Sequence, residues 1–173
     1  MSPSRRTALT LGLVGGALVL VGGAGLALQP GRGPAPREAL RVLTPRMFAV
    51  LAAVADRLCP AAVGLPSAWD LRVPEKVDST LDRLHPATAA EIQQALVLLE
   101  NGLPGLFLHA RPRPFTALAP DAQDRTLEAW RTSRFATLRT AHKALLGLVS
   151  AAFWSDPATF GFVGYPGPPR FAE

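Results

Sequence analysis

The chain has 173 residues, enough for one domain with a modest hydrophobic core and too few for two full domains. Its 17 prolines and 15 glycines predict many interruptions between short helices, and alternating runs of β-branched and aromatic residues are nearly absent. The formal charge of +5 includes two arginines near the N-terminus. The other arginines are scattered and form no basic stripe, so we expect no nucleic-acid binding.

Residues 1–28 have the features of an export signal. Arg5 and Arg6 precede residues 7–28, a charge-free run whose apolar character is diluted by six glycines. This pattern resembles a twin-arginine translocation signal, the route for proteins exported already folded. A run of about 20 apolar residues also suffices to span a bilayer, so an uncleaved membrane anchor is the alternative. Residues 29–40 have the composition of a linker, and residues 41–155 are predicted to form the helical domain.

The first helix of that domain is predicted to start at Thr44-Pro45, a capping hydroxyl followed by proline at the first helical position. Its apolar face comprises Phe48, Leu51, Ala55 and Leu58. Pro60 ends it, and residues 61–73 are expected to form a loop.

A short second helix is predicted from Pro74, with Val77, Leu81 and Leu84 on its apolar face. Thr88 and Glu91 have the spacing of a capping box, which predicts that a third helix opens at Thr88 and closes at Asn101. Carboxylates on the predicted polar faces are expected to be solvated. They are Asp56, Asp78, Asp82, Glu91, Asp124 and Glu128.

Residues 103–115 are broken by prolines, and a fourth helix follows with Leu127 and Trp130 inward. Ser133 is expected to cap a fifth helix of about six turns. Its predicted apolar face comprises Phe135, Leu138, His142, Leu145, Leu146, Val149 and Phe153. The predicted fold is therefore all-α, a small orthogonal bundle of about five helices.

An aromatic tail rich in proline and glycine follows from residue 156 to residue 173, and it is expected to be extended. Aromatic side chains on a proline-restricted backbone lose little entropy on docking, so the tail is a candidate partner interface. The candidate residues are Phe160, Phe162, Tyr165, Pro166 and Phe171. The alternative is that the tail folds back as a lid on its own bundle.

The sequence contains no recognisable catalytic motif. His85, His109 and His142 lie in three different predicted elements without metal-binding spacing, and no G-x-S-x-G motif or glycine-rich phosphate loop follows a strand. Cys59 is the only cysteine, so an internal disulfide or a CxxC metal site is excluded. We expect Cys59 to be buried, with an intermolecular bridge as the alternative. We expect no catalytic, cofactor-binding or metal-binding residues.

The chain resembles the gluconate 2-dehydrogenase subunit 3 family in four places. These are the twin-arginine leader, FAVLAAVADRLCPA, FTALAPDAQDRTLEAW and the closing FWSDPATFGFVGYPGPP. The resemblance covers most of residues 44–169. It implies a non-catalytic partner of a large FAD-containing subunit of the glucose–methanol–choline type, often accompanied by a multihaem cytochrome c subunit at the membrane.

In such complexes the small subunit carries the export signal, so the flavoprotein folds with its cofactor and is exported as a passenger. The resemblance therefore implies an escort subunit of a periplasmic, membrane-associated sugar or sugar-acid dehydrogenase, with FAD in the partner and no cofactor in this chain. Ala8 stands where such a leader usually has Phe. The alternative function is a free-standing, membrane-anchored helical binding protein of the cell envelope.

Overall fold

The computed structural model describes residues 33–101 and 113–168. Within these residues the fold is all-α, as the sequence predicts, with no strand beyond one isolated bridge between Ala62 and Leu65. The five longer helices are α2 (Pro45–Leu58), α3 (Val73–Arg83), α4 (Pro86–Glu100), α6 (Pro120–Arg131) and α7 (Ala136–Trp154). Two short elements complete it, the 3₁₀ turn η1 (Phe115–Ala117) and the helix α8 (Pro157–Phe160).

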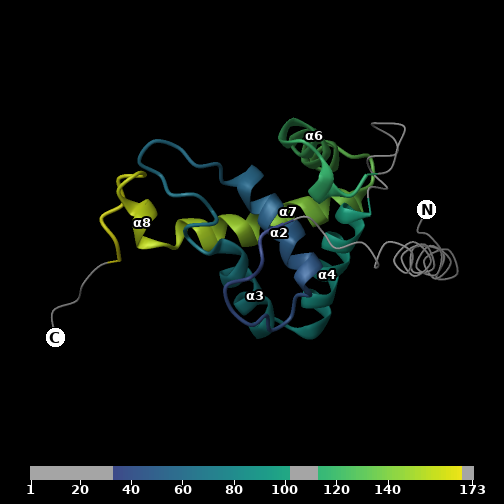
Figure 1. Cartoon of the computed structure of the whole chain (residues 1–173), viewed down its shortest axis with the longest axis horizontal. Coiled ribbons are helices and arrows are strands. Elements are labelled where there is room, and N and C mark those ends of the chain that lie inside the picture. The colour runs from purple at the N-terminus through teal and green to yellow at the C-terminus, as the bar shows by residue number, and fades with distance from the viewer. Residues whose placement is uncertain (1–32, 102–112, 169–173) are drawn as a thin grey trace, which may run out of the picture.

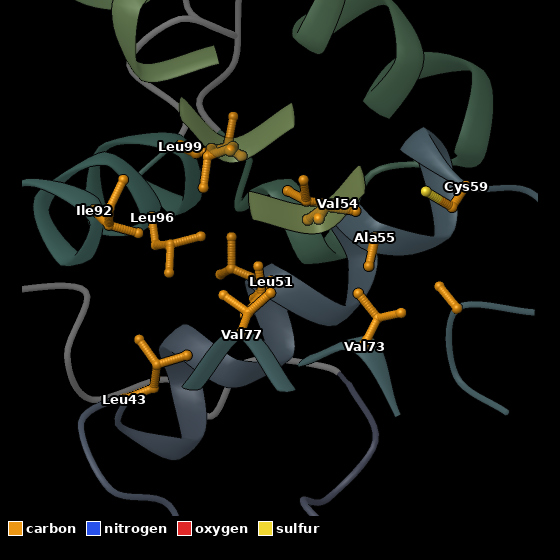
Figure 2. Packing of buried hydrophobic residues seen from close by; sticks show 14 of the residues in the cluster. Leu43, Leu51, Val54, Ala55, Cys59, Val73, Val77, Ile92, Leu96 and Leu99 are labelled. Atoms are coloured by element: carbon orange, nitrogen blue, oxygen red, sulfur yellow. The ribbon is translucent and has the colours of Figure 1, made fainter. Parts of the chain in front are cut away.

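Helix α2 lies at the centre and contacts α3, α4, α6, α7 and η1. Because it is covered on several sides, it buries Val50 and Val54 in addition to the predicted Phe48, Leu51 and Ala55. Figure 2 shows Leu51 and Val54 of α2 among side chains from α3 and α4. A helix that is apolar over most of its surface is stable only in such surroundings, which makes α2 the core of the bundle.

The start of α2 agrees with the prediction, because the Thr44 side chain accepts a hydrogen bond from the Met47 N–H and Pro45 is in the first turn. The predicted start of the third helix is wrong. Helix α4 begins at Pro86, the imidazole of His85 accepts a hydrogen bond from the Ala87 N–H at 3.3 Å, and Thr88 lies inside the first turn. Proline fixes a helical φ and needs no N–H partner, so His85-Pro86 starts the helix two residues before the capping box.

Three further predictions about helix ends and faces are corrected. Leu84 is 36% exposed because α3 ends at Arg83 and Leu84 is already extended. Ser133 does not cap α7: its hydroxyl accepts a hydrogen bond from the Phe135 N–H, and Phe135 is the N-cap residue. Phe135 and Leu146 are 55% and 38% exposed, so the buried stripe of α7 is narrower than predicted. It consists of His142, Leu145, Val149 and Phe153.

One carboxylate expected on a solvated face is buried. Asp78 on α3 is 3% exposed and accepts hydrogen bonds from three consecutive backbone N–H groups, those of residues 41–43. The donor–acceptor distances are 2.7, 3.1 and 2.8 Å. Gln93 of α4 donates to the Val42 carbonyl at 2.8 Å. The chain leading into α2 is therefore held by α3 on one side and by α4 on the other.

The described part of the predicted linker also contacts the bundle. The Arg37 guanidinium lies 4.3 Å from the centroid of the Trp69 ring, and Glu38 forms an ion pair with Arg72. Gly33 approaches α2 so closely that a Cβ there would fall 2.6 Å from the Cβ of Ala49. Glycine is required at this approach because any side chain would collide with the helix.

Candidate partner-binding surface

The C-terminal end of the bundle is built on the Asp156-Pro157 pair. Helix α7 ends at Trp154, and Asp156 then caps α8 by accepting a hydrogen bond from the Ala158 N–H at 2.9 Å. The other oxygen of Asp156 accepts from the Lys76 ammonium of α3 at 2.6 Å. These two donors hold the pKa of Asp156 below its ordinary value, the lysine contributing most. Asp156 therefore both starts α8 and ties it to α3.

The tail is not extended throughout, contrary to the sequence prediction. After α8 the chain turns back, and the Tyr165 N–H donates to the Phe160 carbonyl at 2.9 Å. Gly164 and Gly167 adopt φ values of +67° and +98°, which only glycine adopts without strain. The Phe160 and Tyr165 rings meet edge to face, with centroids 4.9 Å apart. The turn therefore presents its aromatic residues together instead of spreading them along a strand.

Four of the eight exposed large apolar residues of the described chain gather at this end. Trp154 is 40% exposed, Phe162 50%, Val163 55% and Tyr165 46%. The rings of Trp154 and Phe162 stack with centroids 6.5 Å apart. We call these four residues, with the exposed Pro166, the aromatic patch. Clustered exposed aromatic groups are typical of protein interfaces, where they supply anchor residues.

The structure brings most of the predicted interface residues together, but not all in the same role. Phe162, Tyr165 and Pro166 are exposed, and Phe160 is half-buried against Tyr165. Phe171 lies outside the described residues. Sequence reasoning missed Trp154 and Val163. Trp154 could have been found from the helical spacing, because it is off the stripe of His142, Leu145, Val149 and Phe153.

The tail contributes little to the hydrophobic core. The core cluster ends at Phe153, and no residue after it belongs to that cluster among those described. Thr159 is fully buried, but its hydroxyl is satisfied locally by the Asp156 carbonyl at 2.8 Å. The described tail is therefore anchored to the end of α7 and to Lys76 and leaves its aromatic rings at the surface.

Next to the aromatic patch, a groove of about 520 Å³ runs between α3 and α7. Its α7 wall is uncharged and consists of Leu148, Ala151, Ala152 and Ser155. Its α3 wall carries Glu75, Lys76, Ser79, Thr80 and Arg83, and the ion pair of Glu38 with Arg72 lies beside them. Lys76 is paired with Asp156, whereas Arg83 is exposed and has no ion-pair partner in the described chain. The groove thus combines an apolar wall with a charged one.

The residues considered for chemistry lie apart from this surface. His142 is buried between α7 and α6, and this burial lowers its pKa, with Arg131 adding to the effect and Glu128 opposing it. Cys59 is buried as predicted, which raises the pKa of its thiol. His85 caps α4. His109, Arg5 and Arg6 lie outside the described residues.

The described residues lack two further features, a membrane-spanning helix and a metal-binding cluster. None of their helices has both the length and the hydropathy needed to cross a membrane. No cluster of three or more His, Cys, Asp or Glu side chains suited to holding a metal ion is found in residues 33–101 and 113–168.

The comparisons with known proteins give one positive result. No curated protein and no solved structure matches the chain significantly. The family model described as gluconate 2-dehydrogenase subunit 3 matches residues 45–167. This range starts at the first residue of α2 and ends in the turn after α8, so it covers the bundle and the whole aromatic patch. The chain therefore belongs to the gluconate 2-dehydrogenase subunit 3 family.

Proposed function

We propose that this chain is a non-catalytic small subunit that escorts and stabilises a large FAD-dependent dehydrogenase during export by the twin-arginine route. The partner is a sugar or sugar-acid dehydrogenase of the glucose–methanol–choline type, and the complex acts in the periplasm at the membrane. The observation that carries the proposal is the family match over residues 45–167, since the family is named as a subunit of a dehydrogenase.

The surface supports a role in assembly. Trp154, Phe162 and Tyr165 are between 40% and 50% exposed and lie outside the core cluster. Such side chains become favourable when a partner covers them, because burying one aromatic side chain contributes roughly 1.5–3 kcal/mol. In this proposal the partner holds the FAD, and a multihaem cytochrome c subunit accepts its electrons in complexes that contain one.

The test is purification of the tagged full-length chain from its own organism. We expect a flavoprotein to co-purify in a fixed ratio, to show a flavin absorption spectrum and to oxidise a sugar or a sugar acid. The same chain produced alone is expected to be colourless and inactive with those substrates.

Two results would contradict the proposal. A bound flavin or haem in the isolated chain would show that it carries its own redox group. A chain that remains in the membrane without any dehydrogenase would favour the alternative, a free-standing anchored protein that binds a ligand or another envelope protein.

A further inference from the structure

The second half of α7 is apolar on its exposed side as well as on its buried side. Residues 144–155 contain no charged side chain, yet only Leu145, Val149 and Phe153 of this stretch are buried. The outward side comprises Leu146, Gly147, Ser150, Ala151 and Trp154, which we call the outer face of α7. A helix that is apolar all round is normally covered all round, so this face lacks a partner within the described chain.

Gly147 lies in the middle of that face. No contact within the described chain explains why a glycine occupies this position. A Cβ built at Gly147 has no atom within 4 Å beyond its own helix. A glycine inside a helix costs about 1 kcal/mol relative to alanine. The described bundle thus carries a destabilising residue at an open position, which is explained if another backbone approaches α7 there.

The neighbouring groups extend this face into a continuous surface. Ala151 belongs both to the outer face and to the wall of the groove between α3 and α7. Trp154 stacks on Phe162 at the end of the same face, which joins it to the aromatic patch. Figure 1 shows α7 running along the molecule to α8, so the surface follows the helix to its C-terminal end.

The exposed charges that lack a partner beside this surface are basic, whereas Glu38 of the same groove is paired with Arg72 and Glu75 is buried. Lys143 is exposed one turn before Gly147, and Arg83 lines the groove on the α3 side. Neither has an ion-pair partner among the described residues, and the nearby Asp156 is already paired with Lys76. In a dimer formed through this face, Lys143 and Arg83 of one copy would lie near the same cations of the other copy. Their repulsion disfavours self-association.

We infer that the outer face of α7 receives a helix of the large dehydrogenase subunit, which crosses at Gly147 and places carboxylates opposite Lys143 and Arg83. This inference rests on the proposed function and deepens it, because it assigns the main contact to α7 and extends the interface beyond the tail. The contact face of the incoming helix is uncharged, since a charge buried against residues 144–155 would find no partner there.

The test compares the binding of the purified large subunit by full-length variants. Gly147→Leu and Gly147→Glu are expected to weaken binding at least about tenfold, because a side chain at the crossing point keeps the helices apart. Gly147→Ala is expected to raise the melting temperature by about 2–5 °C and still weaken binding. Gln94→Leu and Gln94→Glu, at an exposed position of α4, are the matched controls and should bind like the natural chain.

The charge part of the inference has its own variants. Lys143→Glu and Arg83→Glu should slow association at low salt, and the difference from the natural chain should shrink as salt is added. Equal rates for these variants and the natural chain would contradict the predicted carboxylates on the incoming helix.

The outcomes separate the inference from the proposed function. If the natural chain binds no large subunit, the proposed function fails. If the natural chain binds and the Gly147 variants bind equally well, only the inference fails. The natural chain could also form a concentration-dependent dimer or bind vesicles of anionic lipid. If Gly147→Glu abolishes either of these while dehydrogenase binding is unchanged, the face belongs to another occupant and the inference is overturned.

Discussion

At the residue scale, Asp78 decides how the chain enters the bundle. Its carboxylate accepts hydrogen bonds from the N–H groups of Arg41, Val42 and Leu43, and no other side chain satisfies these donors among the described contacts. Removing the acceptor of such N–H groups costs more free energy than the net contribution of the hydrogen bonds. The reason is that these N–H groups gave up their hydrogen bonds to water on folding and are left without a replacement. Asp78 therefore contributes more to stability than an exposed carboxylate of α3.

Replacing Asp78 by alanine is expected to lower the free energy of unfolding by about 2–4 kcal/mol. Asp82→Ala is the matched control, one turn further along the same helix. Asp82 forms an exposed ion pair with Arg41, and such pairs contribute about 0–1 kcal/mol. Urea unfolding of the two variants measures both values, and equal losses would contradict the role given to Asp78.

The sequence could not distinguish Asp78 from a solvated aspartate. Its helical position is compatible with either environment, and its three donors lie 35 to 37 residues earlier in the chain. By contrast, the burial of Leu127, Trp130 and Cys59 was predictable, because local spacing and side-chain chemistry agree at these positions. Long-range polar contacts have no such local signal.

At the element scale, α7 buries a histidine near Arg131 and Glu128 of α6. His142 is 7% exposed, and burial lowers its pKa below the ordinary value of 6.5. Its stabilising contribution is therefore present above that ordinary value and is lost as the pH falls toward the folded-state pKa. The reason is that the unfolded chain takes up the proton more readily than the folded one.

We expect the free energy of unfolding to fall between about pH 7.5 and about pH 5.5, and His142→Gln to flatten this dependence. His85→Asn, which keeps a capping side chain at the start of α4, should leave the dependence as it is. Urea titrations at several pH values provide the measurement. An unchanged pH profile in His142→Gln would show that another group is responsible.

Helix identity was more predictable than helix limits and faces. All five longer helices were expected, because proline and apolar periodicity mark them. The start of α4 was misplaced because two N-terminal signals, His85-Pro86 and Thr88 with Glu91, compete within a few residues. The face of α7 was drawn too wide, because a charge-free stretch gives no contrast between its buried and exposed sides.

At the scale of the whole molecule, the core and the aromatic patch are separable. The core cluster ends at Phe153, so a chain without residues 155–173 should keep its helices. Losing two aromatic anchors worth roughly 1.5–3 kcal/mol each should weaken binding of the large subunit by two or more powers of ten. Circular dichroism and a binding measurement on the same sample test both parts.

The full-length double variant Phe162→Ser, Tyr165→Ser is the companion to this truncation. Both side chains are about half exposed, so it should weaken binding without unfolding the bundle. Collapse of helicity in the truncated chain would instead identify the tail as a lid on its own core. Retained helicity with retained binding would remove the patch from the interface.

The position of the partner surface was only partly predictable. The aromatic tail indicated an interface from composition alone, but its arrangement depends on the Lys76–Asp156 ion pair, which joins residues 80 positions apart. The contribution of α7 depends on which side of that helix the bundle covers. The ion pair has no local signal, and helical spacing indicates only that Trp154 lies off the buried stripe, so the full surface required the structure.

The central claim is that this chain carries a folded flavoprotein across the membrane, and the most direct measurement is where that flavoprotein resides. With Arg5 and Arg6 both changed to lysine, we expect the large dehydrogenase subunit to remain in the cytoplasm, loaded with FAD, while the natural chain delivers it to the periplasm. A large subunit that reaches the periplasm in the double variant as efficiently as with the natural chain would contradict the account.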